Sequence, residues 1–73
     1  MLSNRERILA LLEREPGLYL RELSRRLDVS LATVRYHLAE MERDGRVVAQ
    51  RAGAFLRLFP SKGLSRDEYM RSG

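Results

Sequence analysis

The side chains with the clearest binding chemistry lie close together at residues 30–37, where the chain reads SLATVRYH. Hydroxyl, guanidinium, phenol and imidazole groups alternate here with small and aliphatic residues. Such groups form hydrogen bonds with phosphate oxygens and with the edges of nucleic-acid bases. The segment therefore predicts a surface that contacts a polyanion, and the question is which structural elements would present it.

A helix over residues 31–44 would present these groups on one side. Ser30 is a suitable N-cap, and the apolar residues that follow recur at spacings of three and four, which is typical of a helix packed by one face: Leu31, Val34, Leu38 and Met41. At about 100° per residue, Ala32, Thr33 and Tyr36 face away from this stripe. Arg35 and His37 lie on its flanks.

Each outward residue has an expected contact. Thr33 can bond a phosphate or a base edge, and its methyl group can lie against thymine. Arg35 can reach guanine or a phosphate, and Tyr36 offers a hydroxyl to a phosphate and a ring to a sugar or base. Small Ala32 permits a close approach, and the free N–H groups near Ser30 favour a phosphate oxygen.

Two of these residues also have interpretations without a ligand. Tyr36 can be a surface aromatic that covers a neighbouring side chain. His37 lies near the edge of the packed face, where a packed or capping role is an equal alternative to DNA contact. With only one histidine and no cysteine in the chain, we expect no metal site.

Three arginines precede this segment in an expected short helix over residues 21–27: Arg21, Arg25 and Arg26. Their guanidinium groups either contact backbone phosphates or pair with nearby acids, for which Glu22 and Asp28 are the candidates. We retain Arg21 as the expected phosphate contact of this helix.

A second basic segment follows the long helix. Residues 47–62 contain Arg51, Arg57 and Lys62 without any acidic residue, so this short stretch has a net charge of +3. Because no acid nearby in the sequence neutralises them, Arg51 and Arg57 are expected to contact phosphates or a minor groove beside the turn of a hairpin. The apolar residues of the same hairpin are expected in the core or an interface: Phe55, Leu56, Leu58 and Phe59.

The remaining sequence predicts the elements that position these groups. A capping box at residues 3–6 starts a helix that Pro16 ends, and residues 18–20 form a short strand. After the helices over 21–27 and 31–44, Gly45 ends the second, and a hairpin runs over residues 47–59 with a turn at 52–54 and Pro60 after it. Residues 65–68 repeat the capping-box pattern and predict a short C-terminal helix. The fold class is α+β, mostly α: a three-helix core with a β-hairpin.

Three stretches of the chain resemble winged helix-turn-helix transcriptional regulators. Residues 20–30 (LRELSRRLDVS) are similar to their first helix and turn, residues 30–38 (SLATVRYHL) to their recognition helix, and residues 41–47 (MERDGRV) to their exit into the wing. Residues 59–63 (FPSKG) resemble the segment after the wing in archaeal regulators with tandem winged helices. The resemblance covers residues 5–63 and points to the ArsR-like and MarR-like groups. Asp28 departs from it, since the family usually has glycine there, but aspartate tolerates a left-handed turn.

This resemblance implies an archaeal or bacterial regulator of transcription that binds double-stranded DNA sequence-specifically. The helix over 31–44 would enter the major groove, and the wing over 46–59 would contact the flanking backbone or minor groove. Such domains usually act as homodimers, paired here by the first helix or by residues 64–73. The alternative is a winged helix used for protein–protein contact in transcription or chromosome machinery, whose mark would be an apolar patch on the outward face of residues 31–44 or on the hairpin.

Composition narrows the remaining possibilities. At 73 residues and 8.5 kDa the chain makes one small domain, which we place at residues 1–62, followed by a tail at 63–73 that begins a helix or a further region. The net charge of +4 and the pI near 10.3 suit a polyanion partner. The sequence has no run of about 18 apolar residues and no features of a signal peptide, so we expect a cytoplasmic protein without membrane contact. It has no nucleophile–base pair, phosphate-cradling glycine loop or carboxylate dyad, so we expect neither an enzyme nor a cofactor.

Overall fold

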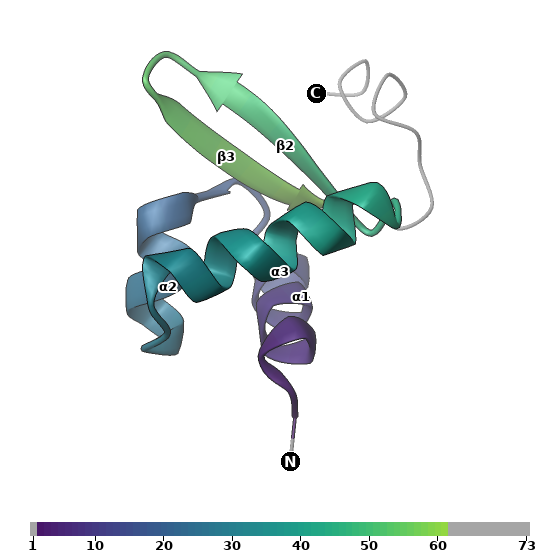
Figure 1. Cartoon of the computed structure of the whole chain (residues 1–73). Helices are drawn as coiled ribbons and strands as arrows, with labels where there is room; N and C mark the ends of the chain where they lie inside the picture. Colours follow the sequence, from purple (N-terminus) through teal and green to yellow (C-terminus); the bar gives the residue numbers. More distant parts are fainter. Residues whose placement is uncertain (1, 62–73) are drawn as a thin grey trace.

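The computed structural model describes residues 2–61, which form three helices and a small antiparallel sheet (Figure 1). The elements follow in the order α1 (Asn4–Arg14), β1 (Leu18–Tyr19), α2 (Leu20–Leu27), α3 (Leu31–Arg43), β2 (Val47–Ala52) and β3 (Phe55–Pro60). The predicted fold class and element order are confirmed. Two helix boundaries differ from the predicted ones by one residue, because α2 begins at Leu20 and α3 ends at Arg43. The C-terminal helix predicted at residues 65–68 lies outside the described residues.

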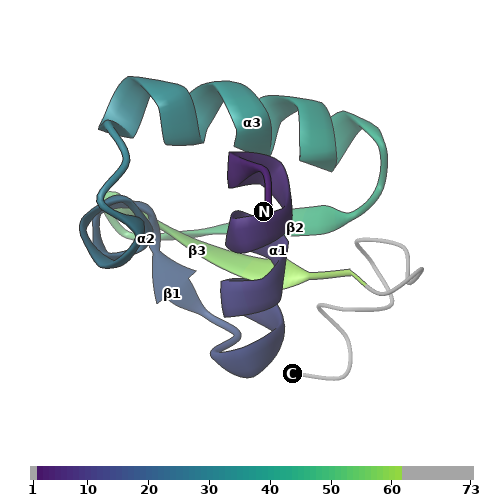
Figure 2. The same ribbon diagram turned by 90° about the horizontal axis from the view of Figure 1, so that it is seen from below.

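The core lies where all six elements meet. Nine buried side chains form one cluster: Ile8, Leu12, Leu18, Leu23, Val34, Leu38, Met41, Val47 and Leu58. Each contributes about 1.5–3 kcal/mol relative to an exposed side chain of the same kind. Seen from below, α3 runs along one side of the domain, with α1 and the strands beside its inner face (Figure 2). The outer face of α3 is left for solvent or for a ligand.

The helix ends follow the predicted capping chemistry. Ser3 and Glu6 form a reciprocal capping box at α1, and the Ser30 hydroxyl accepts from the backbone N–H of Thr33 at 3.2 Å. Asp28 adopts the left-handed conformation (φ 55°, ψ 47°) that the turn between α2 and α3 requires. Arg7 of α1 donates to the carbonyl of Leu27 at 2.7 Å, so the end of α2 is tied to α1.

The hairpin has a tighter turn than the sequence predicted. Pairing runs without a break from Val47↔Pro60 to Ala52↔Phe55, which leaves a two-residue turn at Gly53-Ala54 with Gly53 at φ 64°. Ala52 was expected in the turn and Pro60 after the strand, but both are paired. The sheet order is β1-β3-β2, with β1 pairing only to Leu58 and Arg57.

Candidate nucleic-acid interface

The outward face of α3 carries the residues predicted for it. Tyr36 is 62% exposed, and Ala32 and Arg35 are also exposed, while Thr33 is half-buried. The residues on the opposite side of the helix are buried: Val34, Leu38 and Met41. The amphipathic pattern of the sequence is therefore confirmed, and the helix presents small and polar groups outward over its first two turns.

Two hydroxyl groups meet at the beginning of α3. The Ser30 hydroxyl donates to the Thr33 hydroxyl at 2.8 Å while it accepts from the Thr33 backbone N–H. The pair has two hydroxyl hydrogens and uses one of them internally. The second hydrogen remains for an external acceptor such as a phosphate oxygen, and the cap holds the donor at a fixed place on the helix.

A groove of about 710 Å³ separates the beginnings of α2 and α3 from the turn end of the hairpin. Figure 1 shows the hairpin turn on the same side of the molecule as α2 and the first turn of α3. The groove has an apolar lining with aromatic and charged residues around it: Tyr19, Leu20, Arg21, Glu22, Leu31, Arg35, Arg51, Ala54, Phe55 and Leu56. Three predicted contact residues from three different elements are brought together there, namely Arg21, Arg35 and Arg51.

These three arginines have no internal partner. None of them makes a hydrogen bond or an ion pair with another residue in the part of the chain that the structure describes, and all three are exposed. The acid among the groove residues, Glu22, accepts from the backbone N–H of Tyr19 at 3.2 Å and so caps α2. The three guanidinium groups outnumber the one carboxylate of Glu22, so the groove carries a net positive charge, which attracts a phosphate backbone.

Arg26 of α2 is paired with an acidic residue of the domain itself. Arg26 donates to Glu15 at 3.0 Å, and this hydrogen bond lowers the pKa of Glu15 and raises the pKa of Arg26. Glu22 and Asp28 are the partners that the sequence suggests for the arginines of this helix, but Arg26 pairs with Glu15 from the end of α1. The carboxylate is eleven residues away in sequence and is brought close by the turn at Gly17.

Arg57 is not part of the groove. Its Nε donates to the carbonyl of Gly17 at 3.2 Å, and its guanidinium carbon lies 5.4 Å from the centroid of the Phe59 ring. In the hairpin register Arg51 pairs with Leu56 and Arg57 pairs with Gln50, so the two arginines point to opposite faces of the sheet. The phosphate or minor-groove contact expected of Arg57 stays a prediction, while its guanidinium fastens β3 to the loop before β1.

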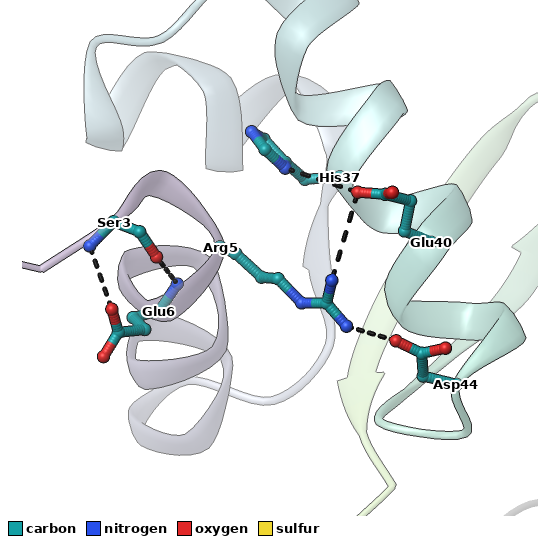
Figure 3. A network of polar contacts seen from close by, with 6 residues as sticks. All are labelled: Ser3, Arg5, Glu6, His37, Glu40 and Asp44. Carbon is teal, nitrogen blue, oxygen red and sulfur yellow. Dashed lines mark hydrogen bonds and ion pairs between the residues drawn. The ribbon is translucent and has the colours of Figure 1, made fainter.

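The His37 side chain also lies outside the groove, on the side of α3 that faces α1. Its Nδ1 is buried without a hydrogen-bond partner among the described residues and lies 3.9 Å from the Glu40 carboxylate (Figure 3). Arg5 reaches across from α1 to the same carboxylate at 4.0 Å and donates to Asp44. The His37 ring meets the Tyr36 ring edge to face, with centroids 5.4 Å apart. His37 thus lies behind Tyr36, in the contact between α1 and α3.

The sequence analysis did not identify an exposed aromatic pair at the wing. Phe55 is 59% exposed and Tyr19 is 39% exposed, and their rings meet edge to face with centroids 5.7 Å apart. Phe55 was expected in the core or an interface along with its neighbours. Period-two alternation counted from buried Leu58 would have placed Phe55 on the other side of the strand.

Two structural features are absent from residues 2–61. No group of three or more His, Cys, Asp or Glu side chains in this range is arranged to hold a metal ion. None of the helices described here has the length and apolar character needed to cross a bilayer.

Residues 1–48 match a sequence family described as winged helix-turn-helix DNA-binding. No curated protein sequence matches the chain. Solved structures with the same fold include HlyU from Vibrio cholerae N16961 in its reduced form, which is 27% identical with a TM-score of 0.78. That superposition covers 96% of this chain and 73% of HlyU.

Two further structures share the fold at lower identity. The transcriptional regulator PcaV from Streptomyces coelicolor, solved with its natural ligand, is 24% identical with a TM-score of 0.79, and the match covers 97% of this chain and 49% of PcaV. FabT from Streptococcus pneumoniae, solved in complex with DNA, is 21% identical with a TM-score of 0.79, and the match covers 99% of this chain and 54% of FabT. The chain thus spans about half the length of each of these two proteins.

Proposed function

Since the chain belongs to the winged helix-turn-helix DNA-binding family, we propose that it is a sequence-specific regulator of transcription. In this proposal α3 enters the major groove of double-stranded DNA, and the hairpin of β2 and β3 contacts the flanking backbone and minor groove. The observation that supports it most is the gathering of three arginines, unpaired among residues 2–61, around one groove beside the polar outward face of α3.

Each part of the interface has a distinct role. Arg35 and Tyr36 read base edges, and the Ser30–Thr33 pair and Ala32 let the beginning of α3 approach the strand closely. Arg21 from α2 and Arg51 from the hairpin bind phosphates of the DNA backbone that separates the major groove from the minor groove. His37 positions Tyr36 from behind, and Arg57 keeps the hairpin in place. Neither of these two needs to touch DNA.

The wider features of the protein belong to the same proposal. The DNA-binding domain occupies residues 1–62, and two copies act as a homodimer on half-sites about one helical turn apart, since regulators of this architecture bind in that way. FabT, solved with DNA, has the same fold. The proposal assigns no catalytic activity to the chain.

A protein-binding winged helix is the second candidate, and one observation favours it. Exposed aromatics lie on both surfaces where an apolar patch was expected as its mark, with Tyr36 on α3 and Phe55 on the hairpin. The three unpaired arginines beside them favour DNA, because an apolar protein surface would have to desolvate these charges without pairing them.

Selection from a pool of random duplexes tests sequence specificity directly. Recovered duplexes should share a recurring motif, and the double variant R35A/Y36A should lose at least tenfold in affinity for it, since one good base contact is worth about 1–3 kcal/mol. Arg14→Ala, an exposed arginine at the end of α1, serves as the charge-matched control for the arginine. Circular dichroism confirms that each variant is folded. Recovery of duplexes without a shared motif, or equal affinity of the double variant, would refute the assignment.

A further inference from the structure

The aromatic pair of Phe55 and Tyr19 lies outside the buried core of the domain. Phe55 follows the Gly53-Ala54 turn directly, is 59% exposed, and is not among the buried side chains of the core. An aromatic ring left in water at the end of a projecting hairpin contributes little to folding. The Phe55 ring packs against the Tyr19 ring, and this contact restricts the orientation of the Phe55 ring.

The charges around Phe55 and Tyr19 indicate which kind of surface binds the two aromatic residues. Both residues are among those that line the groove with Arg21, Arg35 and Arg51, and these cations have no partner among the described residues. The carboxylate beside them, that of Glu22, is engaged in capping α2. An apolar ring surrounded by free cations is complementary to a surface that offers apolar patches between anions. The sugar-phosphate walls of a DNA minor groove are such a surface, and apolar side chains are common contacts there.

We propose that Phe55, braced by Tyr19, packs against a deoxyribose wall of the minor groove from one face of the hairpin, while Arg51, which the register places on the other face, holds a phosphate across the groove. The inference rests on the proposed function and adds to it a contact that carries no charge. Because Phe55 releases no counterion when it binds, its contribution to affinity is independent of salt, whereas that of Arg51 is not.

Titrations of a mixed-sequence duplex at several salt concentrations separate the two kinds of contact. Phe55→Ala should weaken binding about 5- to 10-fold at every salt concentration and leave the slope of log affinity against log salt unchanged, because only part of the ring's apolar surface remains to be buried. Phe55→Leu should recover most of the affinity. Arg51→Ala should instead lower the slope by about 0.9. When a dye saturates the minor groove of the duplex, the wild-type chain and Phe55→Ala should bind this duplex with equal affinity.

The remaining outcomes overturn the inference. Unchanged affinity of Phe55→Ala refutes the contact, and a lowered slope shows that the ring acts only by positioning an arginine. If Phe55→Ala shifts the sedimentation of the chain toward monomer without weakening DNA binding, a second copy covers the ring instead. Failure of the wild-type chain to bind any duplex is a different result, because it removes the proposed function itself.

Discussion

The arginines around the groove give the sharpest quantitative expectation. Arg21, Arg35 and Arg51 are exposed and unpaired within the described residues, so replacing each by alanine breaks no hydrogen bond or ion pair there. Each lost phosphate contact should lower the slope of log affinity against log salt by about 0.9 per protomer. Between 50 and 200 mM salt, a fourfold change, one contact corresponds to a factor of about 3.5, and the two phosphate contacts assigned to Arg21 and Arg51 to a factor of about 12.

Fluorescence anisotropy with a labelled mixed-sequence duplex measures these slopes without knowledge of the operator. Arg14→Ala is the matched control, since it removes the same charge from the end of α1, outside the groove. We expect a slope change of about 0.9 for Arg21→Ala and for Arg51→Ala, a smaller change for Arg35→Ala because Arg35 contacts bases, and a change near zero for this control. If all four variants gave the same slope, the protein would respond to net charge alone, and the groove would not be a phosphate site.

Three further expectations concern the scaffold. Gly17 has φ +91°, and a Cβ there would lie 2.5 Å from Nη2 of Arg57, so Gly17→Ala should lower the free energy of unfolding in urea by about 1 kcal/mol and displace that guanidinium. A variant as stable as wild type would show that the turn is not constrained. Asp28→Gly should raise stability by about 0.5–1 kcal/mol, because glycine adopts the left-handed conformation (φ 55°) without strain; lower stability would show that its backbone entropy dominates. The pKa of Glu15 is lowered from 4.5 by its hydrogen bond with Arg26, so the stability it adds is present above pH 4.5 and is lost as the pH falls through the lowered pKa. The unfolding temperature of Glu15→Gln should therefore decrease less steeply than that of the wild type as the pH falls through this range. An identical decrease in both proteins would contradict the pairing of Glu15 with Arg26.

The outward face of α3 could be predicted because it depends on local information. Apolar residues at spacings of three and four determine which side of the helix is packed, and Tyr36 follows from that pattern wherever the helix docks. The N-caps at Ser3 and Ser30 and the left-handed Asp28 are likewise decided within a few residues. These features account for the confirmed fold and for the orientation of the candidate interface.

The contacts that could not be predicted join residues that are distant in sequence. The faces of Arg51 and Arg57 depend on hairpin register, and a shift of one residue moves a side chain to the other face of the sheet. The sequence marks both arginines as close to a turn, but it does not show that Gly17, forty residues earlier, accepts from Arg57. His37 similarly depends on Arg5 and Glu40, which come together only when α1 packs on α3.

Backbone amide mapping by NMR on the intact 73-residue chain tests the central claim most directly. Titration with a short duplex at low salt should shift the amide signals of residues 30–36 and 51–56 most strongly, and those of Ala10 and Glu13 on the exposed side of α1 least. Shifts centred on α1, with residues 30–36 unaffected, would contradict the assignment of α3 and the hairpin as the surface that binds DNA.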